Sequence, residues 1–333
     1  MEEIADESIP LIVTSPPYPM IGMWDELFVT QNPAISTALE KNMGMEAFEG
    51  MHQELDSVWR EAYRVLQPGG IAAINIGDAT RTLGKTFRLY SNHSRIIQAM
   101  EDLSMSILPS ILWRKPTNSP NKFMGSGMLS PGAYVTLEHE FILLFRKGGK
   151  RNFTLEEDKQ RRRESAYFWE ERNQWFSDLW EFTGTRQSTR KSAGRERSAA
   201  YPLELPWRLI QMFSVIGDVV LDPFLGTGTT TRAALLSGRS SIGYELDPGL
   251  TEELFTGDLN SWKGEQNDWI KNRLQNHEKF VAHRKETKGP NAFKHHHEAW
   301  DIPVMTSQEK EINWPALKSV ECMAQEIHCQ FSW

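Results

Sequence analysis

The stretch Asp222-Pro223-Phe224-Leu225-Gly226-Thr227-Gly228-Thr229-Thr230 directly follows the apolar run Val219-Val220-Leu221. A short run of branched apolar residues that ends in a glycine-rich turn predicts a buried parallel strand, followed by a turn and a helix. Open α/β sheets bind their ligands beyond the carboxyl ends of such strands. Gly226 and Gly228 allow a nucleotide-like cofactor to approach the backbone closely. This stretch therefore predicts a cofactor turn in an α/β domain with a mostly parallel sheet.

A second strand and turn lie near the start of the sequence, where Leu11-Ile12-Val13 precedes Thr14-Ser15-Pro16-Pro17-Tyr18. This turn presents a hydroxyl group, a proline carbonyl and an aromatic ring. Neither proline has an N–H to donate, and both restrict the backbone, so the carbonyl of Pro16 keeps one direction. Two acceptors beside a ring are suited to a planar base that carries an amino group.

Together the two turns resemble motifs IV and I of the DNA methyltransferases that modify exocyclic amino groups, in the permuted beta-class order with the catalytic motif first. Five further segments resemble the helix-to-strand segment of this family, its motif VIII, its lead-in to motif X, motif X and motif II: residues 61–70, 137–145, 177–182, 204–210 and 242–247. The resemblance covers most of residues 1–260. It implies a Rossmann-like methyltransferase fold, S-adenosylmethionine as cofactor and double-stranded DNA as partner.

The resemblance assigns the catalytic roles to Ser15, Pro16, Pro17 and Tyr18. Ser15 Oγ and the Pro16 carbonyl would accept hydrogen bonds from the target amine and free its lone pair to attack a methyl group. Tyr18 would stack on the target base, which has to leave the duplex to reach the pocket.

The resemblance also assigns contacts with the cofactor. A carboxylate at Asp222 would lie near the positive charges of S-adenosylmethionine, Glu245 would accept hydrogen bonds from its ribose, and Asp258 would contact its adenine. The full set of expected cofactor residues is Asp222, Pro223, Phe224, Gly226, Gly228, Thr229, Glu245 and Asp258. The chain has no Gly-Lys-Ser/Thr phosphate loop, which disfavours ATP.

Ser15 favours the N4 amine of cytosine as the target, because cytosine-N4 members of the family mostly carry Ser-Pro-Pro-Tyr and adenine-N6 members mostly Asp-Pro-Pro-Tyr. Adenine N6 is the first alternative, and a non-catalytic DNA-binding protein on the same fold is the second. Methylation of cytosine carbon 5 requires a cysteine nucleophile, and neither Cys322 nor Cys329 lies in a proline-cysteine loop. We expect a role in restriction-modification, with a cognate endonuclease acting on the same DNA site.

The formal net charge of −7 is unlike that of a typical nucleic-acid-binding protein. Phosphate binding depends on local clusters, and residues 146–197 hold fourteen Lys and Arg against nine Asp and Glu. For any one of these basic residues, a solvated helix face is the alternative to DNA contact. The expected DNA contacts are Arg161, Arg162, Arg163, Arg186, Arg190, Lys191, Arg195 and Arg197.

The composition, 39% hydrophobic and 24% charged residues, fits a globular protein, and no apolar run approaches the length of a membrane span. The acidic N-terminus lacks a signal-peptide pattern, which predicts a cytoplasmic enzyme with no membrane contact. Two cysteines exclude a disulfide framework and a four-cysteine zinc site within this sequence, and we expect no metal site.

Hydrophobic periodicity predicts a helix over residues 48–66, a strand over 71–76 and a strand over 141–145. The polar segments 80–92 and 114–132 are predicted to be long surface loops. We therefore divide the chain into a catalytic part (1–145), a target-recognition region (146–197), a cofactor-binding part (198–260) and a C-terminal extension of unknown role (261–333).

Overall fold

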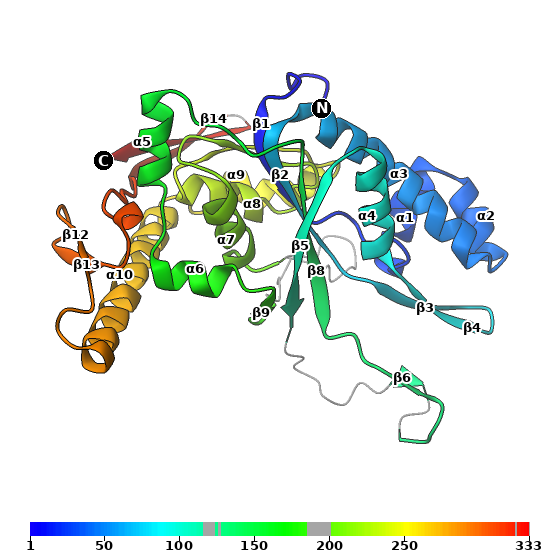
Figure 1. Ribbon diagram of the computed structural model, residues 1–333. Coiled ribbons are helices and arrows are strands. Elements are labelled where there is room, and N and C mark those ends of the chain that lie inside the picture. The colour runs from blue at the N-terminus through cyan, green and yellow to red at the C-terminus, as the bar shows by residue number, and fades with distance from the viewer. Residues whose placement is uncertain (116–123, 126–127, 185–200, 324, 333) are drawn as a thin grey trace.

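The computed structural model describes residues 1–115, 124–125, 128–184, 201–323 and 325–332. Its centre is a seven-stranded sheet with the order β11-β10-β1-β2-β8-β5-β9, and the strands are parallel except for β8. Figure 1 shows this sheet between two groups of helices. The strands of the sheet are β1 (Ile9–Thr14), β2 (Leu66–Ile76), β5 (Ser106–Arg114), β8 (His139–Arg146), β9 (Leu179–Glu181), β10 (Val219–Asp222) and β11 (Ser240–Gly243).

The sheet order brings the two turns of the sequence together. β1 pairs with β10 on one side, Leu11 opposite Val220 and Ile12 opposite Leu221, and with β2 on the other. Because β1 and β10 are parallel neighbours, the turns that follow them leave the same edge of the sheet side by side. The mostly parallel α/β fold is thus confirmed.

The helices lie on both faces of the sheet and beside it. They are α1 (Asp25–Gln31), α2 (Ala34–Glu40), α3 (Gly44–Val65), α4 (Asn92–Asp102), α5 (Glu156–Glu164), α6 (Trp169–Trp175), α7 (Glu204–Phe213), α8 (Thr229–Leu236), α9 (Pro248–Thr256) and α10 (Ser261–Lys288), with short 3-10 helices at Gly22–Trp24 and Ser307–Glu309.

Alternating side chains of the sheet build two separate cores, since successive strand residues point to opposite faces. Ile12 and Ile74 pack against α3 and α4 on one face. Leu11 and Val13 pack against α7 and α8 on the other. Strands buried on both faces read as continuous apolar runs, which is why the sequence revealed them.

The predicted helix over residues 48–66 is confirmed as α3, whose buried residues recur every three or four positions, including Met51, Leu55, Trp59 and Ala62. It ends before Gln67-Pro68-Gly69-Gly70, and Gly69 adopts a positive φ of 83°. The predicted strands 71–76 and 141–145 are confirmed within β2 and β8.

The surface loop predicted over residues 80–92 is wrong. This segment forms a hairpin of β3 (Ala79–Leu83) and β4 (Thr86–Tyr90), followed by the start of α4. Because most side chains of both strands lie at the surface, the segment lacks the half-apolar alternation by which strands are recognised. Of the loop predicted over 114–132, the strand β6 (Met124–Gly125) is described and pairs with β7 (Ala133–Tyr134); residues 116–123 and 126–127 lie outside the described residues.

The described part of the basic region belongs to the main body of the molecule. β9 is the last strand of the central sheet, and the indole N–H of Trp180 donates to the Trp175 carbonyl across 2.9 Å in the core. The target-recognition role assigned to residues 146–197 stays a prediction, and residues 185–197 lie outside the described part of the chain.

The C-terminal extension packs on α6 and α8. The buried side chain of Gln266 in α10 donates to the carbonyls of Leu236 and Pro315 and accepts from the N–H of Leu317. Arg273 forms a bidentate ion pair with Glu171 of α6, at 2.6 and 2.7 Å. The extension ends in two hairpins, β12 (His295–His297) with β13 (Ile302–Val304) and β14 (Ala316–Met323) with β15 (Glu326–Ser332). Its buried polar contacts give it a structural role.

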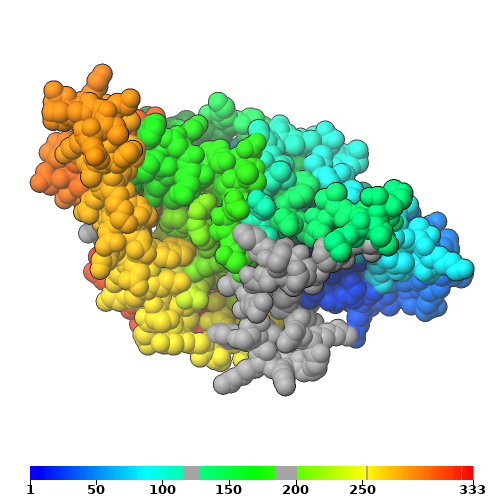
Figure 2. Space-filling model, turned by 90° about the horizontal axis from the view of Figure 1, so that it is seen from below, coloured from blue at the N-terminus to red at the C-terminus, as the bar shows by residue number. Residues whose placement is uncertain are grey.

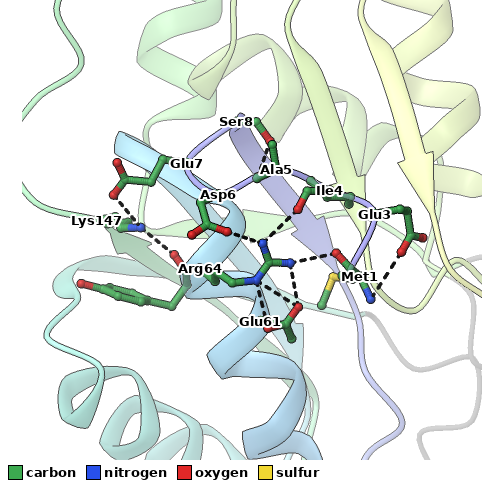
Figure 3. A network of polar contacts seen from close by, with 11 residues as sticks. Met1, Glu3, Ile4, Ala5, Asp6, Glu7, Ser8, Glu61, Arg64 and Lys147 are labelled. Atoms are coloured by element: carbon green, nitrogen blue, oxygen red, sulfur yellow. Dashed lines mark hydrogen bonds and ion pairs between the residues drawn. The ribbon is translucent and has the colours of Figure 1, made fainter.

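The N-terminal segment is fixed to α3 by Arg64 (Figure 3). Its guanidinium donates to the carbonyls of Met1 and Ile4 at 2.8 and 2.9 Å and pairs with Asp6 and Glu61. These contacts position the chain immediately before β1 enters the sheet. No helix in the described residues is long and apolar enough to cross a membrane.

Candidate active site

A cavity of about 1080 Å³ opens at the carboxyl edge of the sheet. The turns after β1, β10 and β11 all contribute to it, together with one wall formed by α1 and α3. Residues of the catalytic and cofactor motifs that line it are Ser15, Pro16, Pro17, Tyr18, Pro223, Phe224, Gly226, Thr229 and Glu245. The structure therefore brings the catalytic turn and most of the cofactor turn into one pocket.

Ser15 and Tyr18 are joined to three polar residues that the motifs did not identify. The Ser15 hydroxyl donates to the Tyr18 hydroxyl at 3.2 Å, and the Tyr18 hydroxyl donates to Glu140 Oε2 at 2.9 Å. The amide nitrogen of Asn75 donates to Tyr18 and to Glu140 at 2.8 and 2.7 Å. Lys115 forms an ion pair with the other oxygen of Glu140.

The strands explain why these three residues meet. Asn75 lies near the end of β2, and Lys115 directly follows β5. Glu140 is the second residue of β8, which runs antiparallel, so the beginning of this strand lies at the edge where the parallel strands end. Burial, and next the charge of Glu140, raise the pKa of Tyr18 far above its usual value, so its hydroxyl stays protonated.

The turn after β10 has the shape expected for close approach of a cofactor. Gly226 has φ +55°, and a Cβ built there would meet nothing within 4 Å, so a side chain would project into open space beside the cavity. The Glu245 carboxylate accepts from the N–H groups of Gly226 and Asp247 at 2.8 and 2.9 Å. These bonds hold the Glu245 side chain at the cavity wall, with acceptor capacity left for a ligand hydroxyl.

Asp222 has a different role from the one expected. It is 1% exposed and does not line the cavity. One of its oxygens accepts from the Thr14 hydroxyl at 2.6 Å and from the Phe224 N–H at 3.1 Å, and the other accepts from the Tyr201 hydroxyl at 3.5 Å. Burial raises the pKa of Asp222. This carboxylate ties the catalytic turn to the cofactor turn.

Two further expected cofactor residues also lie away from the cavity lining. Gly228 has φ +81°, and a Cβ there would lie 2.4 Å from Leu254, so glycine is required for packing at the start of α8. Asp258 is exposed, and its side chain accepts from the N–H of Asn260 at 3.1 Å, where it shapes the turn into α10. Neither residue is retained below as a cofactor contact.

The cavity is acidic. Its lining includes the carboxylates of Glu26, Glu54, Glu61, Glu140, Glu245 and Asp247. Lys115 is the one Lys or Arg side chain that lines it among the residues described. A ligand with a sulfonium and an ammonium group is attracted by such a field, whereas a polyphosphate would be repelled. The residues present therefore fit a cationic cofactor.

The structure does not bring the triple arginine to this pocket. Arg161, Arg162 and Arg163 lie on α5, and the Arg161 guanidinium lies beside Gly217, which precedes β10. α5 is thus at the amino ends of the strands, opposite the cavity (Figure 1). Arg161 pairs with Asp158 of its own helix, and Arg163 pairs with Glu156 and Glu311. A DNA that reaches Ser15 has no direct path to them.

The other five expected DNA contacts, Arg186, Arg190, Lys191, Arg195 and Arg197, lie outside the described residues. On the face that carries the cavity edge, the β3–β4 hairpin (cyan) and α10 (yellow to orange) lie on opposite sides, as Figure 2 shows. The hairpin contacts the β6–β7 arm through Phe87 and Tyr134, whose rings stack 4.7 Å apart.

Three comparisons with known proteins agree with this site. Residues 9–256 match a family model described as DNA methylase. The chain is 51% identical over 314 residues to the type II methyltransferase M.MthZI of Methanothermobacter thermautotrophicus, covering 94% of this chain and 86% of the relative. It is 53% identical over 261 residues to the type II methyltransferase M.MjaI of Methanocaldococcus jannaschii, covering 75% and 85%.

Among solved structures, the chain is similar to a DNA modification methylase of Thermus thermophilus in complex with S-adenosyl-L-methionine. The TM-score is 0.58 at 33% identity, over 75% of this chain and 85% of that one. The protein is thus a methyltransferase of the Rossmann-like fold. In particular, it belongs to the N6/N4 DNA methylase family.

Proposed function

We propose that this protein is a site-specific DNA methyltransferase that transfers a methyl group from S-adenosylmethionine to the N4 amine of cytosine in duplex DNA. One observation carries the proposal: the serine and tyrosine of Ser15-Pro16-Pro17-Tyr18 line the same cavity as the glycine turn after β10. The relatives named above are type II methyltransferases, which supports a role in restriction-modification beside a cognate endonuclease.

The catalytic turn acts on the target amine. The lone pair of an exocyclic amine is delocalised into the ring, so the amine is a poor nucleophile until acceptors draw its hydrogens out of the ring plane. Ser15 Oγ and the Pro16 carbonyl are those acceptors, and the Tyr18 ring stacks on the extruded base. Serine at this position is the residue that cytosine-N4 members of the family mostly carry, which favours cytosine over adenine.

The cofactor side of the cavity is formed by Pro223, Phe224, Gly226 and Glu245. S-adenosylmethionine supplies an electrophilic methyl group on a sulfonium. Glu245 is placed to accept ribose hydroxyls, and the open space at Gly226 lets the backbone approach the ligand. The acidic lining favours the positive charges of this cofactor.

The test is to methylate duplex DNA with the protein, digest the DNA to nucleosides and identify the product by mass spectrometry. N4-methylcytosine is expected. N6-methyladenine would contradict the cytosine assignment while leaving the methyltransferase, and the absence of both would support the non-catalytic alternative. The Ser15→Ala variant is the control, and it should lose most activity but keep its affinity for S-adenosylmethionine.

A further inference from the structure

A continuous chain of hydrogen bonds runs from the catalytic serine to a carboxylate. Ser15 Oγ donates to the Tyr18 hydroxyl across 3.2 Å, and this hydroxyl donates to Glu140 Oε2 across 2.9 Å. All three side chains line the cavity. The chain therefore connects the hydroxyl that receives the target amine with a group that can take up a proton.

The neighbours of this chain fix its direction. A carboxylate only accepts hydrogen bonds, so the amide group that Asn75 turns toward Glu140 is its NH₂. The same NH₂ donates to the Tyr18 oxygen at 2.8 Å. The single hydroxyl proton of Tyr18 is then directed to Glu140, and the Tyr18 oxygen accepts from Ser15. Since the contact between Asn75 and Ser15 is long, at 3.5 Å, Ser15 Oγ keeps acceptor capacity for the amine.

Methyl transfer to an amine requires a proton acceptor. The nitrogen lone pair forms the bond to the methyl carbon, while the S–C bond breaks and leaves its electron pair on sulfur. The nitrogen then carries two hydrogens, the methyl group and a positive charge. This N–H is strongly acidic, because losing the proton restores a lone pair that the ring can delocalise. A carboxylate is a sufficient base for it.

We propose that Ser15, Tyr18 and Glu140 form a proton relay that deprotonates the methylated amine, an inference that rests on the methyltransferase function proposed above. The amine proton passes to Ser15 Oγ, the serine proton to Tyr18 and the tyrosine proton to Glu140 Oε2. The electron pair of the broken N–H bond stays on nitrogen. Ser15 and Tyr18 end with one proton each, as they began, and Glu140 ends as a neutral acid that releases its proton to solvent.

The surroundings of the relay suit this role. Lys115 pairs with the second oxygen of Glu140, so a positive charge balances the carboxylate before it accepts a proton. Lys115 is itself held above the Trp113 ring, 4.3 Å from its centre, and about a third of its side chain is exposed. The raised pKa of Tyr18 means that its hydroxyl gives up a proton only as it receives one.

The relay gives Tyr18 a second role besides stacking on the base. Stacking alone requires only an aromatic ring, and phenylalanine would provide one. A relay requires the hydroxyl. Tyr18→Phe therefore separates the two roles, and Glu140→Gln separates proton uptake from hydrogen bonding, because a glutamine can still accept from Tyr18 but cannot take its proton at neutral pH.

The experiment measures single-turnover methyl transfer for Glu140→Gln, Tyr18→Phe and the double variant, as a function of pH and in H₂O and D₂O. Affinities for S-adenosylmethionine and for DNA, and the thermal unfolding midpoint, are measured on the same proteins. The matched control is Glu138→Gln, which removes the same charge two residues away. Glu138 is half-exposed, pairs with Arg114 and does not line the cavity.

We expect each single variant to lose about 100-fold or more in rate, with the double variant no slower, since both changes break one relay. The wild-type rate should fall on the acidic side and show a solvent isotope effect, and both features should be absent from Glu140→Gln. The affinities and the Glu138→Gln rate should match wild type.

A rate for Glu140→Gln or Tyr18→Phe within about threefold of wild type would overturn the relay. So would a loss of activity that is matched by a loss of cofactor or DNA affinity, because that result indicates a merely structural role. Failure of the proposed function looks different: the wild-type protein itself would yield no N4-methylcytosine, and a relay that acts on an adenine amine would still show the losses above.

Discussion

The buried hydrogen bond between Thr14 and Asp222 joins two turns that are 208 residues apart in the sequence. Thr14→Val removes it with little change in shape, and valine keeps the branched side chain that suits β1. The bond is 2.6 Å long, both residues are 1% exposed, and the acceptor is a carboxylate. A hydrogen bond to a charged group contributes about 1.5 to 3 kcal/mol, so the variant should lose about that much stability.

The pH dependence of this loss identifies its cause. Burial raises the pKa of Asp222 and the Thr14 bond lowers it, so the variant has a folded-state pKa above that of wild type. The loss should be complete above that folded pKa, where Asp222 is ionised and lacks a donor. It should shrink as the pH falls through the folded pKa toward the ordinary value of 3.8, because a protonated carboxyl needs the donor less.

The assay is urea unfolding of wild type and Thr14→Val at several pH values, with S-adenosylmethionine affinity measured by calorimetry. Thr287→Val is the control, since its exposed hydroxyl bonds only to carbonyls of its own helix, and it should change stability by less than about 0.5 kcal/mol. A loss for Thr14→Val equal to that of the control, or one that does not vary with pH, would refute the reasoning.

Two further predictions concern the cofactor turn and the C-terminal extension. Gly226→Ala should weaken S-adenosylmethionine binding about tenfold in calorimetry, because the residue has φ +55° and its methyl group would enter the cavity; Gly264→Ala, with open space in α10, should leave binding unchanged. His277 faces the Glu170 carboxylate and a backbone carbonyl, so both ring nitrogens donate; burial opposes this charge, but the Glu170 bond outweighs it and raises the pKa of His277 above 6.5. Its stabilisation should be complete below about pH 6.5 and lost as the pH rises through the folded pKa; urea unfolding that shows the same difference between wild type and His277→Gln from pH 5.5 to 9 would contradict it.

The sequence predicted the sheet and the two turns well, for a physical reason. β1, β2 and β10 are buried on both faces, so each is a continuous apolar run, and the residues that end parallel neighbours necessarily meet at one edge. The pairing of β1 with β10 across the permuted sequence then places Ser15 and Gly226 in one cavity.

Lys115 and Glu140 could not be predicted in the same way. The rule that ligands lie at carboxyl ends of strands points to the last residues of a strand, but β8 is antiparallel and presents its first residues there. Strand direction within a sheet depends on long-range pairing, which the pattern of residues 139–146 does not reveal. The same limit explains Asp222, whose position after a strand suggested a ligand contact although the fold buries it.

The antiparallel strand also explains how an acidic residue can serve a site built from parallel strands. The residue pairs along β2 and β8 place Asn75 opposite Ile142 and Ile76 opposite Phe141, so Glu140 lies just beyond the end of β2. There it meets the turn after β1, which holds Tyr18, and Lys115 after β5, on the other side of β8. The carboxylate is thus held between two neighbouring strands on a rigid sheet edge. A proton acceptor fixed in this way is aligned with Tyr18 before any substrate binds, which is the preorganisation that the relay requires.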